Sequence, residues 1–235
     1  MGLRTYLCGL AAACMLTPLP ALADPLPGEL SANVALTTNY VFRGISQTDD
    51  GPAIQGGFDY AQDIFYIGTW ASSVDFVDDT TMELDLYAGL APTYNDVTFD
   101  IGVIYYAYPD SPELPTGEQN FVEFHGGVSV PVGLVDLSAA VSYSPDFYGE
   151  IGGAFYYQFT AAVDLSEQTG VEGLSMSGGY GLSRFDNNML GDDYDDWNAG
   201  VSASFFGLDF DLRYFDTTGL AGNDESIAFT ISNTF

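Results

Sequence analysis

His125 is the only histidine of the 235-residue sequence, and Glu123 stands two positions before it. A histidine beside a carboxylate is the pair that a general base requires. A hydrolase would also need an activated serine, but the sequence contains no G-x-S-x-G motif. The alternation of polar and apolar residues also places His125 on the polar face of its segment, whereas a lipid-hydrolysing barrel would carry it on the opposite face. We therefore expect no catalytic residue, and a hydrolase is the least favoured alternative.

The charged residues are mostly acidic: 33 Asp and Glu stand against 4 Lys and Arg, and the formal net charge is −29. This balance disfavours nucleic acid as a partner, because a phosphate backbone needs a basic surface. Acidic pairs such as Asp49-Asp50 and Asp78-Asp79 contain oxygen ligands that suit divalent cations. The ligand spacing of a helix–loop–helix calcium site is absent, so we favour solvated acidic loops and expect neither a metal site nor a cofactor.

The first residues have the three parts of a secretory signal peptide. Arg4 supplies the positive charge, residues 6–16 form an apolar run, and residues 21–23 form a small-x-small cleavage site. The apolar run is too short for a membrane-spanning helix. We therefore predict a signal peptide over residues 1–23 and a mature domain over residues 24–235.

Both cysteines, Cys8 and Cys14, lie within the predicted signal peptide. The predicted mature domain therefore has no disulfide and no thiolate ligand. Residues 11–14 also resemble a lipidation box, which would make the chain a lipoprotein. We favour this alternative less, because the apolar sequence continues past Cys14 and a better cleavage site follows.

The segments that hold the charged residues consist of runs of roughly ten residues, separated by turn residues. Within each run, apolar and polar residues alternate with period two, as they do in transmembrane β-strands. For example, Met82, Leu84 and Leu86 alternate with Glu83 and Asp85. We predict an all-β fold, an antiparallel up-and-down transmembrane barrel of twelve strands. The expected strands are 31–43, 53–61, 64–73, 81–92, 97–108, 119–130, 135–144, 154–165, 173–186, 194–206, 208–216 and 225–235. A soluble β-sandwich is disfavoured, because the polar face is built mainly from small residues instead of lysine and glutamate.

Short and long connections alternate along the predicted strands, and the longer ones are acidic. This is typical of barrels in the outer membrane of Gram-negative bacteria, where short turns face the periplasm and long loops face outward. The partners would then include membrane lipid and lipopolysaccharide. Aromatic residues near the expected strand ends would form girdles at the lipid headgroups. These residues are Tyr40, Phe42, Tyr60, Tyr94, Tyr105, Tyr108, Tyr143, Trp197, Tyr214 and Phe235.

Three segments resemble the TorF-type porin family, a family of bacterial barrel proteins long described as conserved hypothetical proteins. The segments are 39–47 (NYVFRGISQ), 68–76 (GTWASSVDF) and 83–89 (ELDLYAG). The resemblance covers the whole mature chain and is densest before Tyr108. It implies an outer-membrane barrel with a pore, but it supplies no solute and no site. Ser73 stands where the resemblance leads us to expect asparagine.

The chain ends on Phe235, with Ile231, Phe229 and Ile227 at alternating positions before it. This pattern resembles the signal that the barrel-assembly machinery reads, which implies that machinery as a further partner. A terminal aromatic residue can dock in a pocket while its strand adds to an exposed sheet edge.

The remaining candidate residues share the inward side of the predicted barrel, where charges either line a water path or pair with one another. They are Arg43, Glu83, Asp85, Asp100, Glu123, His125, Asp164, Asp209, Asp211 and Arg213. Because acids outnumber arginines among them, we predict a cation-preferring channel for small solutes. Two alternatives remain: a narrow, closed lumen in which Arg43 and Arg213 pair with carboxylates, and an adhesive or structural barrel whose acidic loops bind partners or divalent ions.

Overall fold

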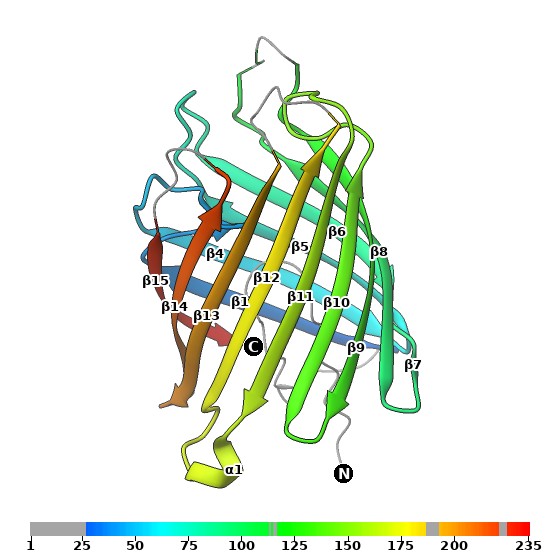
Figure 1. The fold of residues 1–235 in the computed structure, drawn as a ribbon, viewed down its shortest axis with the longest axis vertical. Coiled ribbons are helices and arrows are strands. Elements are labelled where there is room, and N and C mark those ends of the chain that lie inside the picture. Colours follow the sequence, from blue (N-terminus) through cyan, green and yellow to red (C-terminus); the bar gives the residue numbers. More distant parts are fainter. Residues whose placement is uncertain (1–26, 113, 115–116, 187–192, 221–224) are drawn as a thin grey trace.

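The computed structural model describes residues 27–112, 114, 117–186, 193–220 and 225–235. The predicted signal peptide, residues 1–23, lies outside this range. The described residues form one closed antiparallel barrel of twelve long strands (Figure 1). These strands are β1 (Glu29–Thr37), β4 (Ala53–Gln62), β5 (Phe65–Ser73), β6 (Met82–Leu90), β8 (Val97–Ala107), β9 (Phe121–Val132), β10 (Val135–Ser144), β11 (Ala154–Asp164), β12 (Ser175–Phe185), β13 (Tyr194–Phe205), β14 (Leu208–Thr218) and β15 (Ser226–Thr234).

The ring is closed by hydrogen bonds between the first and last strands. Neighbours in the sequence pair along the barrel, β6 pairs with β8, and β1 pairs with both β4 and β15. The backbone of Phe235 adds to this seam, because its N–H donates to the Ala32 carbonyl at 2.7 Å and its carbonyl accepts from Ala32 at 2.9 Å. Closure leaves no sheet edge, which is what a strand-built protein needs in lipid.

Four short elements interrupt the twelve-strand pattern. The two-residue strand β7 (Thr93–Tyr94) continues β6 and pairs with the start of β8. The helix α1 (Ser166–Thr169) forms the unusually long connection between β11 and β12. The strands β2 (Val41–Phe42) and β3 (Ile45–Ser46) form a separate hairpin that belongs to no part of the barrel wall.

The strand prediction is confirmed, with one informative error in the first strand. That strand was expected to run from residue 31 to 43, but β1 ends at Thr37. The hydroxyl of Thr37 donates to the Asn39 carbonyl at 2.9 Å, and the chain leaves the wall at this point. Alternation continues through the next residues, so periodicity alone could not show the change of direction.

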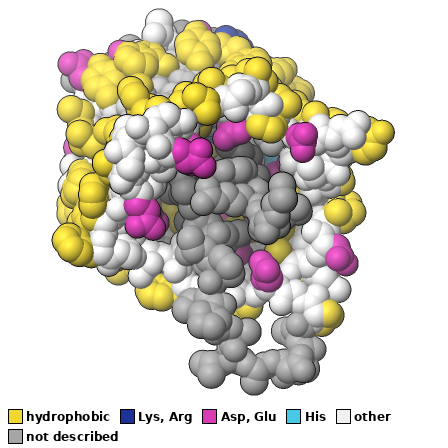
Figure 2. Space-filling view, turned by 90° about the horizontal axis from the view of Figure 1, so that it is seen from below, with side chains coloured by type: hydrophobic (Ala, Val, Ile, Leu, Met, Phe, Trp, Pro, Cys, Tyr) yellow, Lys and Arg dark blue, Asp and Glu magenta, His cyan; other side chains and the backbone are white. Residues whose placement is uncertain are grey.

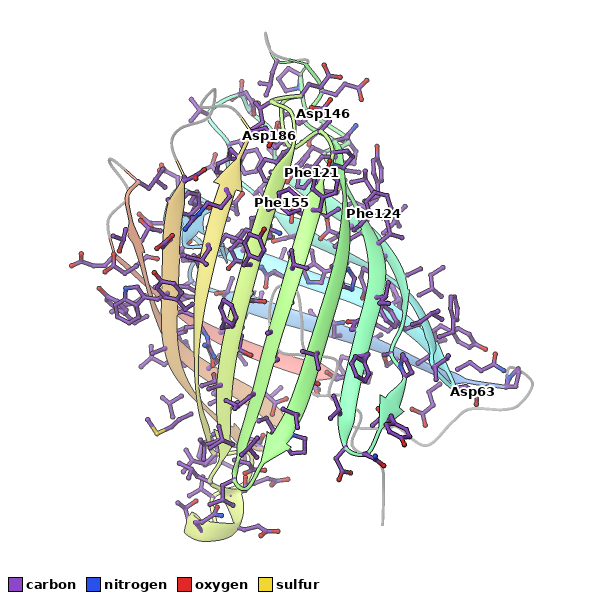
Figure 3. All side chains as sticks on the ribbon, turned by 45° about the vertical axis from the view of Figure 1, so that its right-hand side comes forward. Asp63, Phe121, Phe124, Asp146, Phe155 and Asp186 are labelled. Atoms are coloured by element: carbon purple, nitrogen blue, oxygen red, sulfur yellow. The ribbon has the colours of Figure 1, made fainter. Side chains whose placement is uncertain are left out.

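Apolar side chains cover the outside of the barrel. On β9, Phe121 is 4% exposed and faces inward, whereas Phe124 is 52% exposed and faces outward (Figure 3). Figure 2 shows the same division from below, with hydrophobic side chains around the wall and acidic side chains near the rim. Outward apolar residues from around the ring include Leu36, Ile54, Phe58, Ile67, Leu86, Ile101, Leu137, Phe159, Met176, Val201, Leu212 and Ile227. Such a wall matches the hydrocarbon of a bilayer.

The two ends of the barrel differ. Figure 3 places Asp146 and Asp186 at the end with the long connections, and Asp63 in a short turn at the opposite end. Asp63 has a φ of 54°, the left-handed conformation that tight turns use. The long connections are therefore the predicted outer loops. Among the described residues, no helix is long and apolar enough to cross a bilayer.

Candidate functional site: the lumen and its inward hairpin

The segment between β1 and β4 folds into the barrel. Its strands β2 and β3 are joined by a two-residue turn, Arg43-Gly44, in which φ is 48° and 80°. Positive φ at both positions is the geometry of a type I′ hairpin turn, for which glycine is suited. A Cβ on Gly44 would lie 2.5 Å from Cγ2 of Thr217 and 2.8 Å from Cβ of Asp196. The hairpin tip therefore packs tightly against the wall at β13 and β14.

The hairpin corrects the prediction for three aromatic residues. Tyr40 and Phe42 were expected in a lipid-facing girdle, but Tyr40 is buried and both pack in aromatic clusters inside the barrel. Tyr108 was also expected there, and it is buried beside Phe76 and Tyr148. These rings alternate with polar residues as girdle residues do, but they belong to a connecting segment or to a loop.

A polar network holds the base of the hairpin. The Asn39 side chain donates to Asp50 at 2.7 Å and accepts from the hydroxyl groups of Ser46 at 2.7 Å and Thr48 at 3.2 Å. Thr48 also accepts the backbone N–H of Tyr40 at 3.1 Å. Because these bonds link the two arms of the hairpin, the direction in which its tip points is set at the base.

At the tip, Arg43 makes a buried, two-pronged ion pair with Glu123 on β9. Its two terminal nitrogens donate to Oε1 at 2.9 Å and to Oε2 at 2.7 Å, and the two side chains are 7% and 2% exposed. The guanidinium also lies 4.1 Å from the centre of the Tyr156 ring and 4.6 Å from that of Phe42. Paired donors and an aromatic face are the contacts that arginine makes best. Tyr156 is on β11, opposite β4 in the ring, so the hairpin crosses the lumen.

Tyrosine hydroxyl groups donate hydrogen bonds to several carboxylates on the wall from β4 to β9. Glu83 accepts from Tyr40 at 2.7 Å and from Tyr108 at 2.8 Å. Asp59 accepts from Tyr87, and Asp100 accepts from Tyr66 at 2.8 Å. A buried carboxylate with such donors is much less costly than a bare one.

Two buried, inward carboxylates each keep a spare oxygen. Among the described residues, the buried side-chain atoms without a hydrogen-bond partner include Oδ1 of Asp85 and Oδ2 of Asp196. Each residue is only 4% exposed. The other oxygen of Asp196 accepts from the Tyr156 hydroxyl at 3.3 Å, so its carboxylate lies beside the ring under Arg43. The lumen therefore has unused buried acceptors, and that of Asp196 lies beside the buried arginine.

Residues 23–234 match the model of a family described as "Bacterial protein of unknown function (Gcw_chp)". The chain belongs to this family. A closed barrel with an apolar outer wall, in a bacterial family, is an outer-membrane protein. No curated protein matches the sequence.

The chain is also similar, at low sequence identity, to several longer proteins of solved structure. OccK5 (OpdH) of Pseudomonas aeruginosa is 16% identical with a TM-score of 0.48, over 86% of this chain and 62% of that one. A BenF-like porin of Pseudomonas fluorescens is 12% identical with a TM-score of 0.46, over 85% and 58%. OccAB3 of Acinetobacter baumannii is 12% identical with a TM-score of 0.45, over 86% and 59%. This chain thus spans less than two thirds of the length of each of these three proteins.

The structure brings only some of the predicted lumen residues together. Arg43 and Glu123 form the ion pair, and Glu83 and Asp85 lie on β6 of the same wall, one strand beyond β8. His125 lies lower, with Nε2 3.1 Å from the Tyr66 hydroxyl and 3.4 Å from Asp100. Its Nδ1 is buried and has no hydrogen-bond partner. This set lacks the serine nucleophile that a hydrolase would require.

The other predicted lumen residues lie apart from Arg43. Arg213, on β14, donates to Asn198 at 2.7 Å, Ser177 at 2.8 Å and Asp211 at 3.1 Å. Asp209 accepts from Ser204 at 2.5 Å. Asp164 is exposed at the end of β11, where it accepts the backbone N–H of Ser166 at 2.8 Å and caps the turn into α1.

Sequence reasoning missed four residues of this site: Asp59, Tyr106, Tyr156 and Asp196. The same alternation that selected Glu83 places Asp59 and Asp196 on the inward side of their strands, so the signal was present. The signal for Tyr156 was an aromatic residue on the polar side, between the outward Phe155 and Tyr157.

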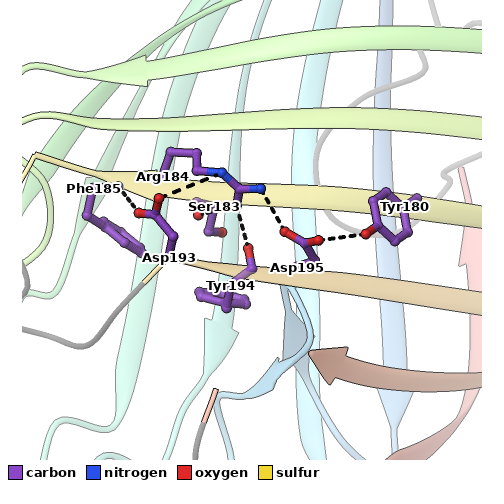
Figure 4. Close-up of polar contacts among 7 residues, drawn as sticks. All are labelled: Tyr180, Ser183, Arg184, Phe185, Asp193, Tyr194 and Asp195. Atoms are coloured by element: carbon purple, nitrogen blue, oxygen red, sulfur yellow. Dashed lines mark hydrogen bonds and ion pairs between the residues drawn. The ribbon is translucent and has the colours of Figure 1, made fainter. Parts of the chain in front are cut away.

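The third arginine of the described residues, Arg184, lies on the outward side of β12, and Figure 4 shows its contacts. Arg184 on β12 donates to the Tyr194 carbonyl at 3.0 Å and to Asp195 at 2.9 Å, and lies 3.8 Å from Asp193. Tyr180 donates to the second oxygen of Asp195 at 2.6 Å. These contacts tie β12 to β13 near the outer loops. Within the described ranges, Arg43 and Arg213 are therefore the two arginines of the lumen.

Outer-loop residues cover the hairpin. The Tyr148 ring packs against Phe76 and Tyr108 with centroid distances of 6.1 and 5.6 Å, and its hydroxyl donates to Gln119 at 2.8 Å. Burial, with smaller effects from the charges of Asp78 and Glu83, raises the pKa of Tyr148 to about 12. At the surface, hydrogen bonds from Thr81 lower the pKa of Asp110. In the described part of the chain, no three acidic, histidine or cysteine side chains are arranged to hold a metal ion.

Proposed function

We propose that the barrel is a passive outer-membrane channel for small solutes, that it prefers cations, and that it is related to the TorF-type porins its motifs resemble. The excess of inward carboxylates over arginines carries this proposal. Arg43 and Arg213 stand against Asp59, Glu83, Asp85, Asp100, Glu123, Asp196, Asp209 and Asp211. Fixed charges of one sign in a narrow, low-dielectric passage concentrate the opposite ions.

The inward hairpin narrows the proposed pathway. It fills the lumen beside β4 to β9 with aromatic side chains, so the proposed route follows the other wall, from β10 to β14. That wall carries small polar side chains, including the bonded pairs Ser138–Thr160 at 2.6 Å and Ser175–Ser202 at 2.8 Å. Of the predicted pore-lining residues, Asp209, Asp211 and Arg213 border this route. The remainder, Arg43, Glu83, Asp85, Asp100, Glu123, His125 and Asp164, would shape its field.

Recording from planar bilayers tests the channel and its selectivity. We expect discrete conductance steps and, in a potassium chloride gradient, a reversal potential whose sign shows that potassium carries most of the current. Absence of steps from correctly folded protein would contradict the channel. A reversal potential of the opposite sign would contradict the cation preference and leave the channel intact.

A non-conducting structural or adhesive barrel is the second candidate, and the hairpin across the lumen favours it. In that case the acidic outer loops would be the working surface, binding partners or divalent ions. The same recordings separate the two candidates, because this barrel would give no steps under any salt condition.

Export and assembly complete the proposal. Residues 1–23 would be removed as a signal peptide, which N-terminal sequencing of the mature protein tests. The strand containing Ile227, Phe229 and Ile231 and ending at Phe235 would be read by the barrel-assembly machinery, and the finished wall would contact lipid and lipopolysaccharide. Deleting Phe235 should lower the yield of membrane-inserted barrel, whereas Phe235→Tyr, which keeps a ring, should not. Normal yield after the deletion would contradict the assembly signal.

A further inference from the structure

The wall around Arg43 has the form of a binding site for a guanidinium group. Glu123 provides two parallel acceptors, Tyr156 provides an aromatic face, and the Tyr106 hydroxyl, 3.3 Å from Glu123, helps to hold the carboxylate in place. These three side chains come from β8, β9 and β11, so they belong to the barrel wall. They would stay in position if the hairpin tip withdrew.

The same site contains more negative charge than Arg43 balances. Glu123 pairs with the Arg43 guanidinium and Asp196 lies within its electrostatic reach. Asp85 adds negative charge beside this pair, because both Glu83 and Glu123 act electrostatically on it. Oδ1 of Asp85 and Oδ2 of Asp196 are buried without a hydrogen-bond partner. Buried acceptors of this kind are costly unless a donor or cation satisfies them. The excess negative charge and the unpartnered oxygens both indicate a ligand that is positively charged and rich in hydrogen-bond donors.

We propose that this wall site binds organic cations that carry a guanidinium group, and that Arg43 occupies it as a tethered ligand in the unliganded barrel. The proposal rests on the proposed channel and names its solute class. A guanidinium matches the site better than an ammonium ion, because it is planar, pairs with a carboxylate through two bonds and stacks on a ring. A bare metal ion matches it poorly, because the described acidic residues are too dispersed to form a metal cluster.

Tethering determines how the site should respond to free ligand. Because the network around Asn39 holds the hairpin, Arg43 is present at a high effective concentration, and a free guanidinium must compete with it. Removing the Arg43 side chain should free the site while Glu123 and Tyr156 stay in the wall. Free guanidinium should then bind more tightly to Arg43→Ala than to the parent protein.

The test is a binding titration on folded barrel in detergent micelles, so it needs no conductance. The probe is methylguanidinium, the matched control is methylammonium, and binding is followed by saturation-transfer NMR. We expect saturable binding of methylguanidinium to Arg43→Ala, with apparent affinity at least about tenfold above that of the parent protein, as expected when a tethered competitor is removed. Methylammonium should bind Arg43→Ala at least about tenfold more weakly than methylguanidinium does, because it lacks the planar fork.

Two further variants test whether the wall residues form the site. Adding Glu123→Gln to Arg43→Ala should abolish binding, and adding Tyr156→Leu should weaken it severalfold. If the first double variant fails to fold, Asp85→Asn in the Arg43→Ala background replaces it and should weaken binding. Equal binding of both probes, or binding unchanged by all the folded wall variants, overturns the proposal.

Competition in the parent protein gives an independent readout. Trp70 packs on Tyr40 at a centroid distance of 5.3 Å, so its emission reports the hairpin. The other tryptophan, Trp197, packs on the outward Tyr214 and can be removed as Trp197→Phe. Methylguanidinium should shift Trp70 emission in this protein, and methylammonium at the same concentration should not. Equal shifts with both probes overturn the proposal. A silent planar bilayer would instead contradict the channel and leave the binding result standing.

Discussion

The two walls of the lumen follow the same alternation but are built from different residues. From β4 to β9, the inward positions carry rings and acids, as in Tyr66, Tyr106 and Glu123. From β10 to β13, they carry mainly small residues, such as Ser142, Ser177 and Gly179, with exceptions that include Tyr156 and Asp196 near the hairpin. On β14, they carry the charged residues Asp209, Asp211 and Arg213. The hairpin packs its aromatic side chains against the first wall and presses its tip on the second. The wall from β4 to β9 thus forms a packed core with the hairpin. The wall from β10 to β14 leaves space beside the hairpin.

The wall from β4 to β9, called here the crowded wall, depends on glycines that leave space for its rings. The wall from β10 to β14 is called the small-residue wall. A Cβ on Gly68 would lie 2.5 Å from atoms of the Tyr87 ring, so this ring lies directly over the glycine of the neighbouring strand. In the small-residue wall, the atom nearest to a Cβ on Gly179 is the amide nitrogen of Asn198, at 2.9 Å, which is the movable end of a side chain. The comparison teaches that a period-two pattern sets which side a residue faces, while residue volume decides whether that side is filled or open.

The largest expected effect comes from removing the hairpin. Replacing residues 40–48 with a short Gly-Ser turn should raise single-channel conductance severalfold, because the crossing segment is lost and the small-residue wall faces an open lumen. The control replaces residues 166–172, which include α1 and lie at the opposite end of the barrel. Planar bilayer recording measures both. Equal conductance in the two variants would show that the hairpin does not restrict the pathway.

The two lumen arginines provide the next test. Arg43→Ala removes one partner of a buried ion pair and should cost about 3–5 kcal/mol of unfolding free energy. Arg213 is 21% exposed and divides its hydrogen bonds between the neutral Asn198 and Ser177 and the carboxylate of Asp211. Because this arginine is partly exposed to solvent, Arg213→Ala should cost about 1–2 kcal/mol. Urea unfolding in lipid vesicles, followed by tryptophan emission, measures both losses. Similar losses would mean that the two walls hold their arginines equally firmly.

Much of the fold could be predicted because a barrel strand must alternate, and turn residues mark its ends. The range 135–144, for example, coincides with β10. The hairpin could not be predicted in this way, because Tyr40, Val41 and Phe42 continue the pattern of β1 after the chain has left the wall. Arg43 was expected inside the barrel as a strand residue, but it reaches the lumen at a turn. Its pairing with Glu123, 80 residues away, depends on the crossing of the hairpin, which no local pattern encodes.

A matched pair of glycine substitutions would sharpen the comparison of packing. Gly68→Ala should destabilise the barrel by about 1–3 kcal/mol, because the added methyl group must displace the Tyr87 ring, which is held by its bond to Asp59. Gly179→Ala should cost less, about 1 kcal/mol, because the overlap at 2.9 Å is smaller and involves a side-chain amide nitrogen, although Asn198 also accepts from Arg213. The same urea unfolding assay measures both. A larger loss from Gly179→Ala would mean that the small-residue wall is the more tightly packed one.

The smallest expected effect is a change with pH at the outer end of the crowded wall. Burial raises the pKa of Tyr148 from 10.0 to about 12, so the folded loop cluster favours the neutral phenol. Its stabilising contribution is therefore complete below pH 10 and is lost as the pH rises toward 12. The near-ultraviolet circular dichroism of the parent barrel should show a transition in this interval.

The matching variants assign that transition to one side chain. Tyr148→Phe cannot ionise, so its aromatic signal should change less across the same interval, although the bond to Gln119 is lost at every pH. Tyr94→Phe changes an exposed tyrosine at the opposite end of the barrel and should leave the transition unchanged. If instead Tyr148→Phe keeps the full transition, a group other than Tyr148 ionises in this interval. The packing of the loop cluster over the hairpin would then not depend on the neutral Tyr148 hydroxyl.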